Sequence, residues 1–197
     1  MALRIKGSSG VTFDENYVQF SELNYFLDSD LTLTEIDNFT VDIFKTSGGN
    51  SWDRQAYSLI PFTAPCTIEF NKQAAVGDNT LSYAMVAWNE DPETNASFNS
   101  LDHASYPYQT NAYSVYNNGS QVLNTGSWST SEKFHIVYNI DGTIKHYNGS
   151  TLLYSANYGT GKTVYVDSSF YSPNSTYGGF SNLKVTRRAW DGNQYTT

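Results

Sequence analysis

Stretches in which apolar and polar residues alternate recur along most of the chain. In FHIVY, the side chains of Phe134, Ile136 and Tyr138 fall on one face, and those of His135 and Val137 fall on the other. Alternation with a period of two is typical of a β-strand with one buried face. Similar patterns predict further strands at residues 31–36, 39–44, 55–60, 66–70, 81–88, 111–117, 121–126, 143–147, 150–158, 163–171 and 178–185.

Tight turns are predicted between several of these stretches. The dipeptides concerned are Asn118-Gly119, Asp141-Gly142 and Asn148-Gly149. Each can reach a positive φ at low cost and therefore favours a hairpin. Roughly a dozen short strands with such turns, and no amphipathic segment long enough for a helix, predict an all-β fold of two packed antiparallel sheets.

Chain length and a change of pattern near residue 30 indicate the domain organisation. A chain of 197 residues fits one β-sandwich. Residues 1–30 are rich in polar segments, and we expect them to form an N-terminal arm or a first edge strand, with the sandwich over residues 31–197. The polar segment 89–110 has no clear period, and a segment of this length is typical of a functional or disordered loop.

Charge and cysteine content exclude several classes of partner. The net charge is −8, whereas proteins that bind nucleic acid usually carry a basic patch. No apolar run approaches the length of a membrane span, and the opening MALRIKGSSG lacks the apolar core of a secretory signal. The single cysteine, Cys66, is predicted to be a small buried hydrophobe. We therefore expect a soluble protein, made in a cytoplasm, that binds neither nucleic acid nor a membrane.

Motifs that could support catalysis are incomplete. Glycoside hydrolases of family 16 place E-x-D-x-x-E on one strand; Glu35 and Asp37 match the first two acids, but Thr40 replaces the third. A retaining hydrolase needs a second carboxyl group that can donate a proton. The GTGKT sequence at 159–163 would need a glycine five residues before its second Gly to form a phosphate-binding loop, and Ala156 stands there. We expect no catalytic residues and no cofactor.

An acidic cluster and several aromatic residues near loops are the binding candidates. Residues 89–93, NEDPE, and Asp102 offer the oxygen ligands that Ca²⁺ prefers, but their spacing is not diagnostic, and we expect a solvated loop and no metal site. Carbohydrate sites typically pair an aromatic platform with Asp or Asn. Tryptophans of β-sandwiches mostly belong to the core, and this alternative stays open. The carbohydrate-binding candidates are Trp52, Asp53, Trp88, Asn89, Tyr106 and Tyr108.

The order of these segments resembles concanavalin A-like domains, in particular the versions found in structural proteins of bacteriophages and other viruses. The resemblance covers residues 39–187. It implies a concanavalin A-like jelly-roll β-sandwich and little about a ligand, because the matching positions are mostly turns and core residues. These positions are Ile136, Tyr138, Asp141, Gly142, Ile144, Tyr147, Asn148, Gly149, Tyr165, Asp167, Ser169, Phe170, Gly179, Asn182 and Leu183.

The resemblance and the incomplete catalytic motifs lead us to expect a non-enzymatic structural protein of a virus particle, either a capsid decoration or a tail appendage. We expect it to assemble in the host cytoplasm as a homo-oligomer, with other virion proteins as partners and a glycan of the host surface as a further ligand. Two alternatives stay open: a carbohydrate-binding lectin module, and a glycoside hydrolase of the family-16 type.

Overall fold

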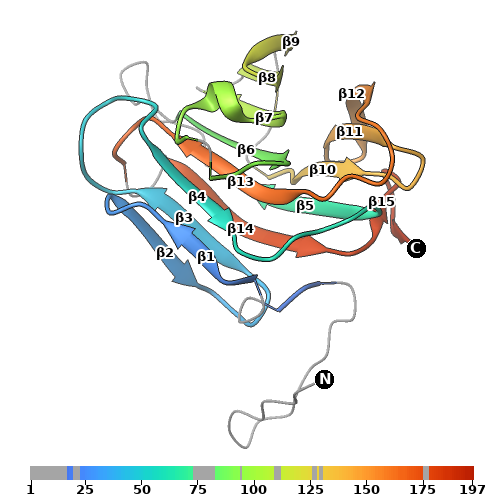
Figure 1. Cartoon of the computed structure of the whole chain (residues 1–197), viewed down its shortest axis with the longest axis horizontal. Coiled ribbons are helices and arrows are strands. Elements are labelled where there is room, and N and C mark those ends of the chain that lie inside the picture. The colour runs from blue at the N-terminus through green and yellow to red at the C-terminus, as the bar shows by residue number, and fades with distance from the viewer. Residues whose placement is uncertain are drawn as a thin grey trace, which may run out of the picture.

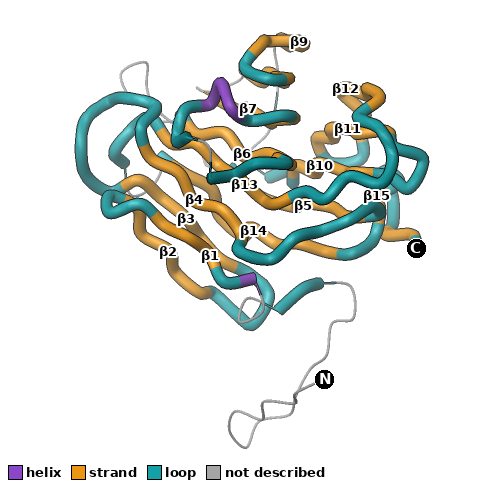
Figure 2. The backbone as a smooth tube through the Cα atoms, in the orientation of Figure 1, coloured by secondary structure: helices purple, strands orange, loops and turns teal. Residues whose placement is uncertain are grey.

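The computed structural model describes residues 17–19, 23–72, 83–93, 95–108, 112–125, 128, 131–174 and 178–197. These residues form two seven-stranded antiparallel sheets and a short hairpin (Figures 1 and 2). In spatial order, the first sheet consists of β1 (Tyr25–Leu27), β4 (Arg54–Ser58), β13 (Tyr165–Phe170), β6 (Ala84–Asn89), β7 (His103–Tyr108), β8 (Ala112–Asn117) and β9 (Ser120–Thr125). The second sheet consists of β12 (Thr151–Asn157), β11 (Thr143–Asn148), β10 (Phe134–Tyr138), β5 (Cys66–Asn71), β14 (Gly179–Thr186), β3 (Val41–Lys45) and β2 (Leu31–Glu35). The hairpin consists of β15 (Ala189–Trp190) and β16 (Tyr195–Thr196).

Strands that are distant in the chain lie side by side in both sheets. In the first sheet β13 lies between β4 and β6, and in the second sheet β14 lies between β5 and β3. Between these neighbouring strands the chain also forms strands of the other sheet, an arrangement that is typical of jelly rolls. Beyond β6, the strands β7, β8 and β9 follow one another toward the top of Figure 1. The all-β, two-sheet fold expected from the sequence is confirmed.

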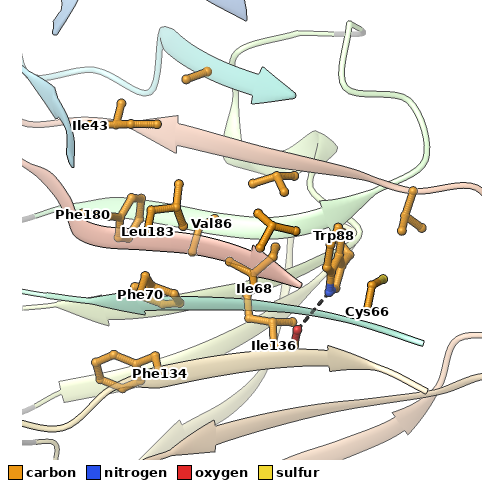
Figure 3. Packing of buried hydrophobic residues seen from close by; sticks show 14 of the residues in the cluster. Ile43, Cys66, Ile68, Phe70, Val86, Trp88, Phe134, Ile136, Phe180 and Leu183 are labelled. Carbon is orange, nitrogen blue, oxygen red and sulfur yellow. Dashed lines mark hydrogen bonds between the residues drawn. The ribbon is translucent and has the colours of Figure 1, made fainter. Parts of the chain in front are cut away.

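The main hydrophobic core lies between the two sheets. Phe134, Ile136 and Tyr138 all belong to it, as the alternation in β10 predicts. Trp88 of β6 is fully buried, and its indole N–H donates a hydrogen bond of 2.9 Å to the carbonyl oxygen of Ile136 across the core (Figure 3). Cys66 is also fully buried, which raises the pKa of its thiol. It is the small buried hydrophobe expected from its apolar neighbours.

Two of the predicted turns have the expected backbone. In the β8–β9 hairpin, Asn118 and Gly119 have φ values of 47° and 71°, the left-handed pair that a type I′ turn requires. Gly142, between β10 and β11, has a φ of 82° and would place a Cβ atom 2.7 Å from the backbone of Gly159. A side chain at position 142 would therefore collide with the neighbouring loop as well as strain the turn.

The third turn is displaced by one residue from its predicted place. Asn148 is the last residue of β11 and pairs with Thr151, the first residue of β12. The two turn residues are therefore Gly149 and Ser150, and Gly149 carries the positive φ of 57°.

The prediction of a long loop at 89–110 is wrong, because β7 lies within this segment. The polar residues at the start of HASYPY, His103 and Ser105, lie on the core side of β7, so the pattern does not mark the core face in the usual way. Ser105 faces the core, where its hydroxyl lies 2.7 Å from the hydroxyl of Tyr113, while Ala104 and Tyr106 belong to a second apolar cluster. The remaining connection contains one 3₁₀ turn, η1 (Phe98–Ser100), which is drawn in purple just before β7 in Figure 2.

The described residues near both chain ends contact the sheets. β1 pairs with β4 at one edge of the first sheet, and the amide of Val18 donates to the carbonyl oxygen of Val185 at 2.7 Å. The other residues of the expected N-terminal arm, 1–16 and 20–22, lie outside the described residues. At the other end, the β15–β16 hairpin packs on the outward side of the second sheet, where Trp190 stacks on His135.

Candidate functional site

The outward face of the first sheet carries its own apolar cluster, separate from the core. Along β6, Val86 and Trp88 point into the core, whereas Met85 and Ala87 point the opposite way. Neighbouring residues in a strand face opposite sides of a sheet, so Met85 and Ala87 mark its outward face. The cluster on this face also contains Ala104 and Tyr106 of β7 and Leu101, all of them buried.

Seven aromatic side chains form a continuous network over this cluster, which we call the aromatic face. Tyr106 is at its centre, with its ring centroid 5.7 Å from that of Trp52, 6.1 Å from Tyr83, 4.5 Å from Tyr108 and 6.0 Å from Tyr116. Tyr106 is 9% exposed, and the six others are partly exposed. The members are Trp52, Tyr83, Phe98, Tyr106, Tyr108, Tyr116 and Tyr171.

A buried lysine holds the loop that presents Trp52. Lys45 ends β3 and has no exposed surface, and its ammonium group lies among four oxygen acceptors. These are the carbonyl oxygens of Gly49 at 2.8 Å, Ser51 at 3.1 Å and Tyr171 at 3.1 Å, and Oδ1 of Asp53 at 2.8 Å. A buried cation with such partners is strongly bound, because any alternative leaves a charge without solvation. Lys45 therefore ties residues 49–53 to the end of β13.

The carboxylate of Asp53 is engaged in this arrangement. Partial burial alone would raise its pKa, but the hydrogen bond from Lys45 and the charge of Arg54 outweigh this effect and lower it. Asp53 is also 41% exposed and lies next to Trp52 in the chain. It therefore holds the loop in place through Lys45 and keeps part of its carboxylate exposed next in the chain to Trp52.

The connection between β6 and β7 lies across the same face. The hydroxyl of Ser169 on β13 donates to the carbonyl oxygen of Ala96 at 2.6 Å, and Phe98 contacts the rings of both Trp52 and Tyr116. At the start of the connection, the amide of Glu90 donates to Asp102 at 3.0 Å. These contacts make the connection an ordered part of the aromatic face.

A buried polar pair lies beside the apolar cluster. Asp167 of β13 is 1% exposed, and its carboxyl group accepts hydrogen bonds from Nδ2 of Asn89 at 2.8 Å and from the amide of Ser168 at 2.7 Å. Burial outweighs these hydrogen bonds and raises the pKa of Asp167 to about 8. The carboxyl group is therefore mostly protonated at neutral pH, and a neutral acid is far less costly to bury than a carboxylate.

The candidates chosen from the sequence divide into two groups. The structure brings Trp52, Tyr106 and Tyr108 together in the aromatic face, with Asp53 at the border. Trp88 points into the core, so its ring cannot serve as a surface platform. Asn89 points outward but is fully buried against Asp167. We therefore leave Trp88 and Asn89 out of the binding surface.

Four members of the aromatic face were not chosen from the sequence. Tyr83 stands two residues before Met85, and Tyr171 stands two residues after Ser169. The period of two therefore predicts that both side chains continue the outward-facing rows of β6 and β13. Tyr116 could have been found in the same way from β8. Phe98 could not, because it lies in an irregular connection that no periodic signal places.

The motifs judged incomplete in the sequence do not assemble into an active site. Glu35 is the last residue of β2, and Asp37 lies in the following turn, where its carboxylate accepts a hydrogen bond from the amide of Phe39 at 2.8 Å. Both carboxylates are exposed at a sheet edge, and Thr40 is buried. The loop at 159–163 leads into β13 and so lacks the helix that phosphate binding by such a loop requires.

Two features are absent from the described part of the chain. Among these residues, no group of three or more His, Cys, Asp or Glu side chains is arranged to hold a metal ion. Within the same ranges, no helix is long and apolar enough to cross a membrane.

Comparisons with known proteins bear on the fold. No family model and no curated protein sequence matches the chain. Among solved structures, the carbohydrate recognition domain of Emp46p in its potassium-bound form is similar, with a TM-score of 0.55 and 11% identity over 85% of this chain and 89% of that one. The carbohydrate recognition domain of Emp47p has a TM-score of 0.53 and 12% identity over 91% of this chain and 99% of that one.

A third similar structure is the SPRY domain of human HERC1, with a TM-score of 0.52 and 16% identity over 82% of this chain and 97% of that one. At such low identity these similarities establish the fold alone. The chain is a concanavalin A-like jelly-roll sandwich, a fold that carbohydrate recognition domains and SPRY domains share.

Proposed function

We propose that this chain is a non-enzymatic carbohydrate-binding module and that the aromatic face is its binding surface. The observation that carries the proposal is the network of seven partly or largely buried rings on the outward side of one sheet. Aromatic rings offer large and stiff contact surfaces at low entropic cost, and tyrosine adds a hydroxyl group that can bond to sugar hydroxyls. Two of the similar structures are named carbohydrate recognition domains, which supports the same choice.

The arrangement of polar groups also fits a sugar ligand. Asp53 lies beside Trp52 and keeps a partly exposed carboxylate, and a carboxylate can accept hydrogen bonds from two neighbouring hydroxyls. Lys45 and the β6–β7 connection hold the rings in place before any ligand arrives. A prearranged surface lowers the entropic cost of binding.

A glycan array tests the proposal directly. The folded chain should bind a restricted set of glycans, and Trp52→Ala should reduce that signal by about tenfold, as expected for an aromatic residue at the centre of an interface. Binding to no glycan on the array, or equal binding by the wild type and the variant, would contradict the proposal. Polysaccharide cleavage by the wild type, lost in Glu35→Gln, would contradict its non-enzymatic part.

A place in a virus particle is a separate proposal that rests on the sequence resemblance over residues 39–187. The similar structures described above lend it no support. A virion protein with an aromatic face could attach the particle to a host-surface glycan, as a homo-oligomer among other virion proteins. Mass spectrometry of purified particles tests it: peptides of this chain should be present, and particles without them would contradict the proposal.

A further inference from the structure

The positive charges around the aromatic face are already engaged by partners within the protein. Lys45 is fully buried among its four oxygen acceptors. Arg54 of β4 donates from Nε to Oδ2 of Asp30 at 2.7 Å. Lys162, in the loop before β13, forms an ion pair with Glu90 at the start of the β6–β7 connection. Lys45 therefore has no surface for a ligand, and the charges of the partly exposed Arg54 and Lys162 are already balanced by carboxylates of the protein.

The remaining described cations belong to strands of the second sheet or to segments next to them in the chain. They are Lys72, Lys133, Lys145, Lys184, Arg187 and Arg188. Recognition of a carboxylate or sulfate group in water usually needs an available arginine or lysine, because only a charge-assisted hydrogen bond offsets the loss of hydration. Within the described residues, none of these six side chains belongs to a strand of the first sheet.

Negative charges, in contrast, border the aromatic face. Asp53 follows Trp52 in the chain, and the β6–β7 connection carries Asp91 and Glu93 in addition to Glu90, which is paired with Lys162. Glu93 is exposed, and its charge adds to the effect of burial in raising the pKa of Tyr57, whose ring is on the outward side of β4. A ligand that approaches this surface therefore meets a negative potential, in a protein whose net charge is −8.

We infer that the aromatic face selects neutral glycans and rejects those that carry sialic acid, uronic acid or sulfate. The inference rests on the proposed function and adds the ligand class. A neutral sugar ring is not repelled by the surrounding carboxylates and can donate hydrogen bonds to them from its hydroxyl groups. An anionic sugar meets like charges and, among the residues that the structure describes, no cation whose charge is not already balanced, and like-charge contacts are a common source of specificity.

Matched pairs of glycans provide the test. Oligosaccharides that end in galactose or mannose are compared with the same oligosaccharides carrying terminal sialic acid or sulfate. Where a neutral member binds, its anionic counterpart should bind at least about fivefold more weakly, the upper range of exposed charge pairs, and the gap should narrow at high ionic strength. Equal or tighter binding of the anionic members would overturn the inference while leaving the proposed function in place. Binding of neither member would overturn both.

Two charge-reversal variants identify the source of the selectivity. Glu93→Lys changes an exposed acid in the β6–β7 connection, and Glu132→Lys changes an exposed acid just before β10 of the second sheet, with the same change in net charge. Glu93→Lys should raise the affinity for the anionic member by about threefold and leave the neutral member unaffected. Glu132→Lys should change neither. An equal gain in both variants, or no gain in Glu93→Lys, would contradict a local effect at the aromatic face.

Discussion

The outward faces of the two sheets use aromatic residues in different ways. On the second sheet the C-terminal hairpin covers the surface: Trp190 stacks on His135 at 4.6 Å, and the hydroxyl of Tyr195 donates to Glu69 at 2.6 Å. On the first sheet, the seven rings of the aromatic face contact one another, and six of them keep partly exposed surfaces. Aromatic residues on the second sheet attach one part of the chain to another, while those on the first sheet are available to a ligand.

The attachment of the chain ends to the second sheet depends on one buried carboxylate. Glu69 on β5 is 3% exposed and accepts hydrogen bonds from Tyr17, Tyr195 and Lys133. Burial alone would raise the pKa of Glu69, but His135 and Lys133 outweigh it and lower the pKa far below its usual range. On the first sheet the corresponding buried acid, Asp167, bonds to Asn89 and attaches no chain end. An aromatic cluster on a sheet is therefore a candidate binding surface only where its rings keep exposed area, as six rings of the aromatic face do.

Replacing Glu69 by alanine should have the largest effect on stability. The change removes a buried acceptor and leaves the hydroxyls of Tyr17 and Tyr195 without it, which should lower the free energy of unfolding by about 4 kcal/mol. Urea denaturation measures this loss. Under conditions where the variant stays folded, its glycan affinity should equal that of the wild type. A parallel loss of affinity would mean that the two faces are not independent.

Replacing Lys45 by methionine should affect the aromatic face on the first sheet. Loss of the ammonium group leaves three carbonyl groups and the carboxylate of Asp53 without their donor, at a cost of about 2 kcal/mol in unfolding free energy. Because Lys45 also holds the loop that presents Trp52, glycan affinity should fall by about tenfold in the folded variant. Calorimetric titration measures the affinity.

Lys72→Met is the matched control for that experiment. Lys72 is also buried, donates to the carbonyl oxygen of Gly179 at 2.7 Å, and has its pKa lowered to about 7 by burial. It follows β5 of the second sheet, so its replacement should leave glycan affinity unchanged. Equal losses of affinity in the two variants would show that Lys45 acts only through global stability.

The pH dependence of the unfolding free energy should reveal the raised pKa of Asp167. Its pKa is raised from the ordinary 3.8 to about 8, so the folded protein holds a proton that the unfolded chain has already released in this interval. The contribution to stability is complete below the unfolded pKa and is lost as the pH rises toward the folded value. Between about pH 5 and about pH 8, the wild type should lose about 1 kcal/mol more per pH unit than Asp167→Asn, which cannot ionise. Equal slopes in urea denaturation would contradict a protonated Asp167.

The sequence predicted the fold better than the site, for a physical reason. Period-two patterns and glycine turns act locally, so β10, β11 and the turn at Asn118 could be placed from a few residues each. β7 was missed because its polar His103 and Ser105 lie on the core side and its apolar Ala104 and Tyr106 lie on the outward side, the reverse of the usual pattern.

The site depends on contacts between distant segments. Lys45 looks like an ordinary end of a strand in the sequence, since its partners come from residues 49–53 and from Tyr171. Trp88 and Asn89 were chosen together as neighbours, yet successive residues of a strand face opposite sides of the sheet. Trp52 and Tyr106 were chosen as separate candidates, and only the folded sheet brings their ring centroids to 5.7 Å.

The most direct test of the aromatic face is a calorimetric titration of the strongest array glycan into two tryptophan variants. Trp52 lies on the aromatic face and Trp190 lies on the opposite sheet, and both are partly exposed. Trp52→Ala should weaken binding by about tenfold or more, while Trp190→Ala should leave the affinity within about twofold of the wild type. Weaker binding in Trp190→Ala with full binding in Trp52→Ala would place the ligand on the second sheet and contradict the account.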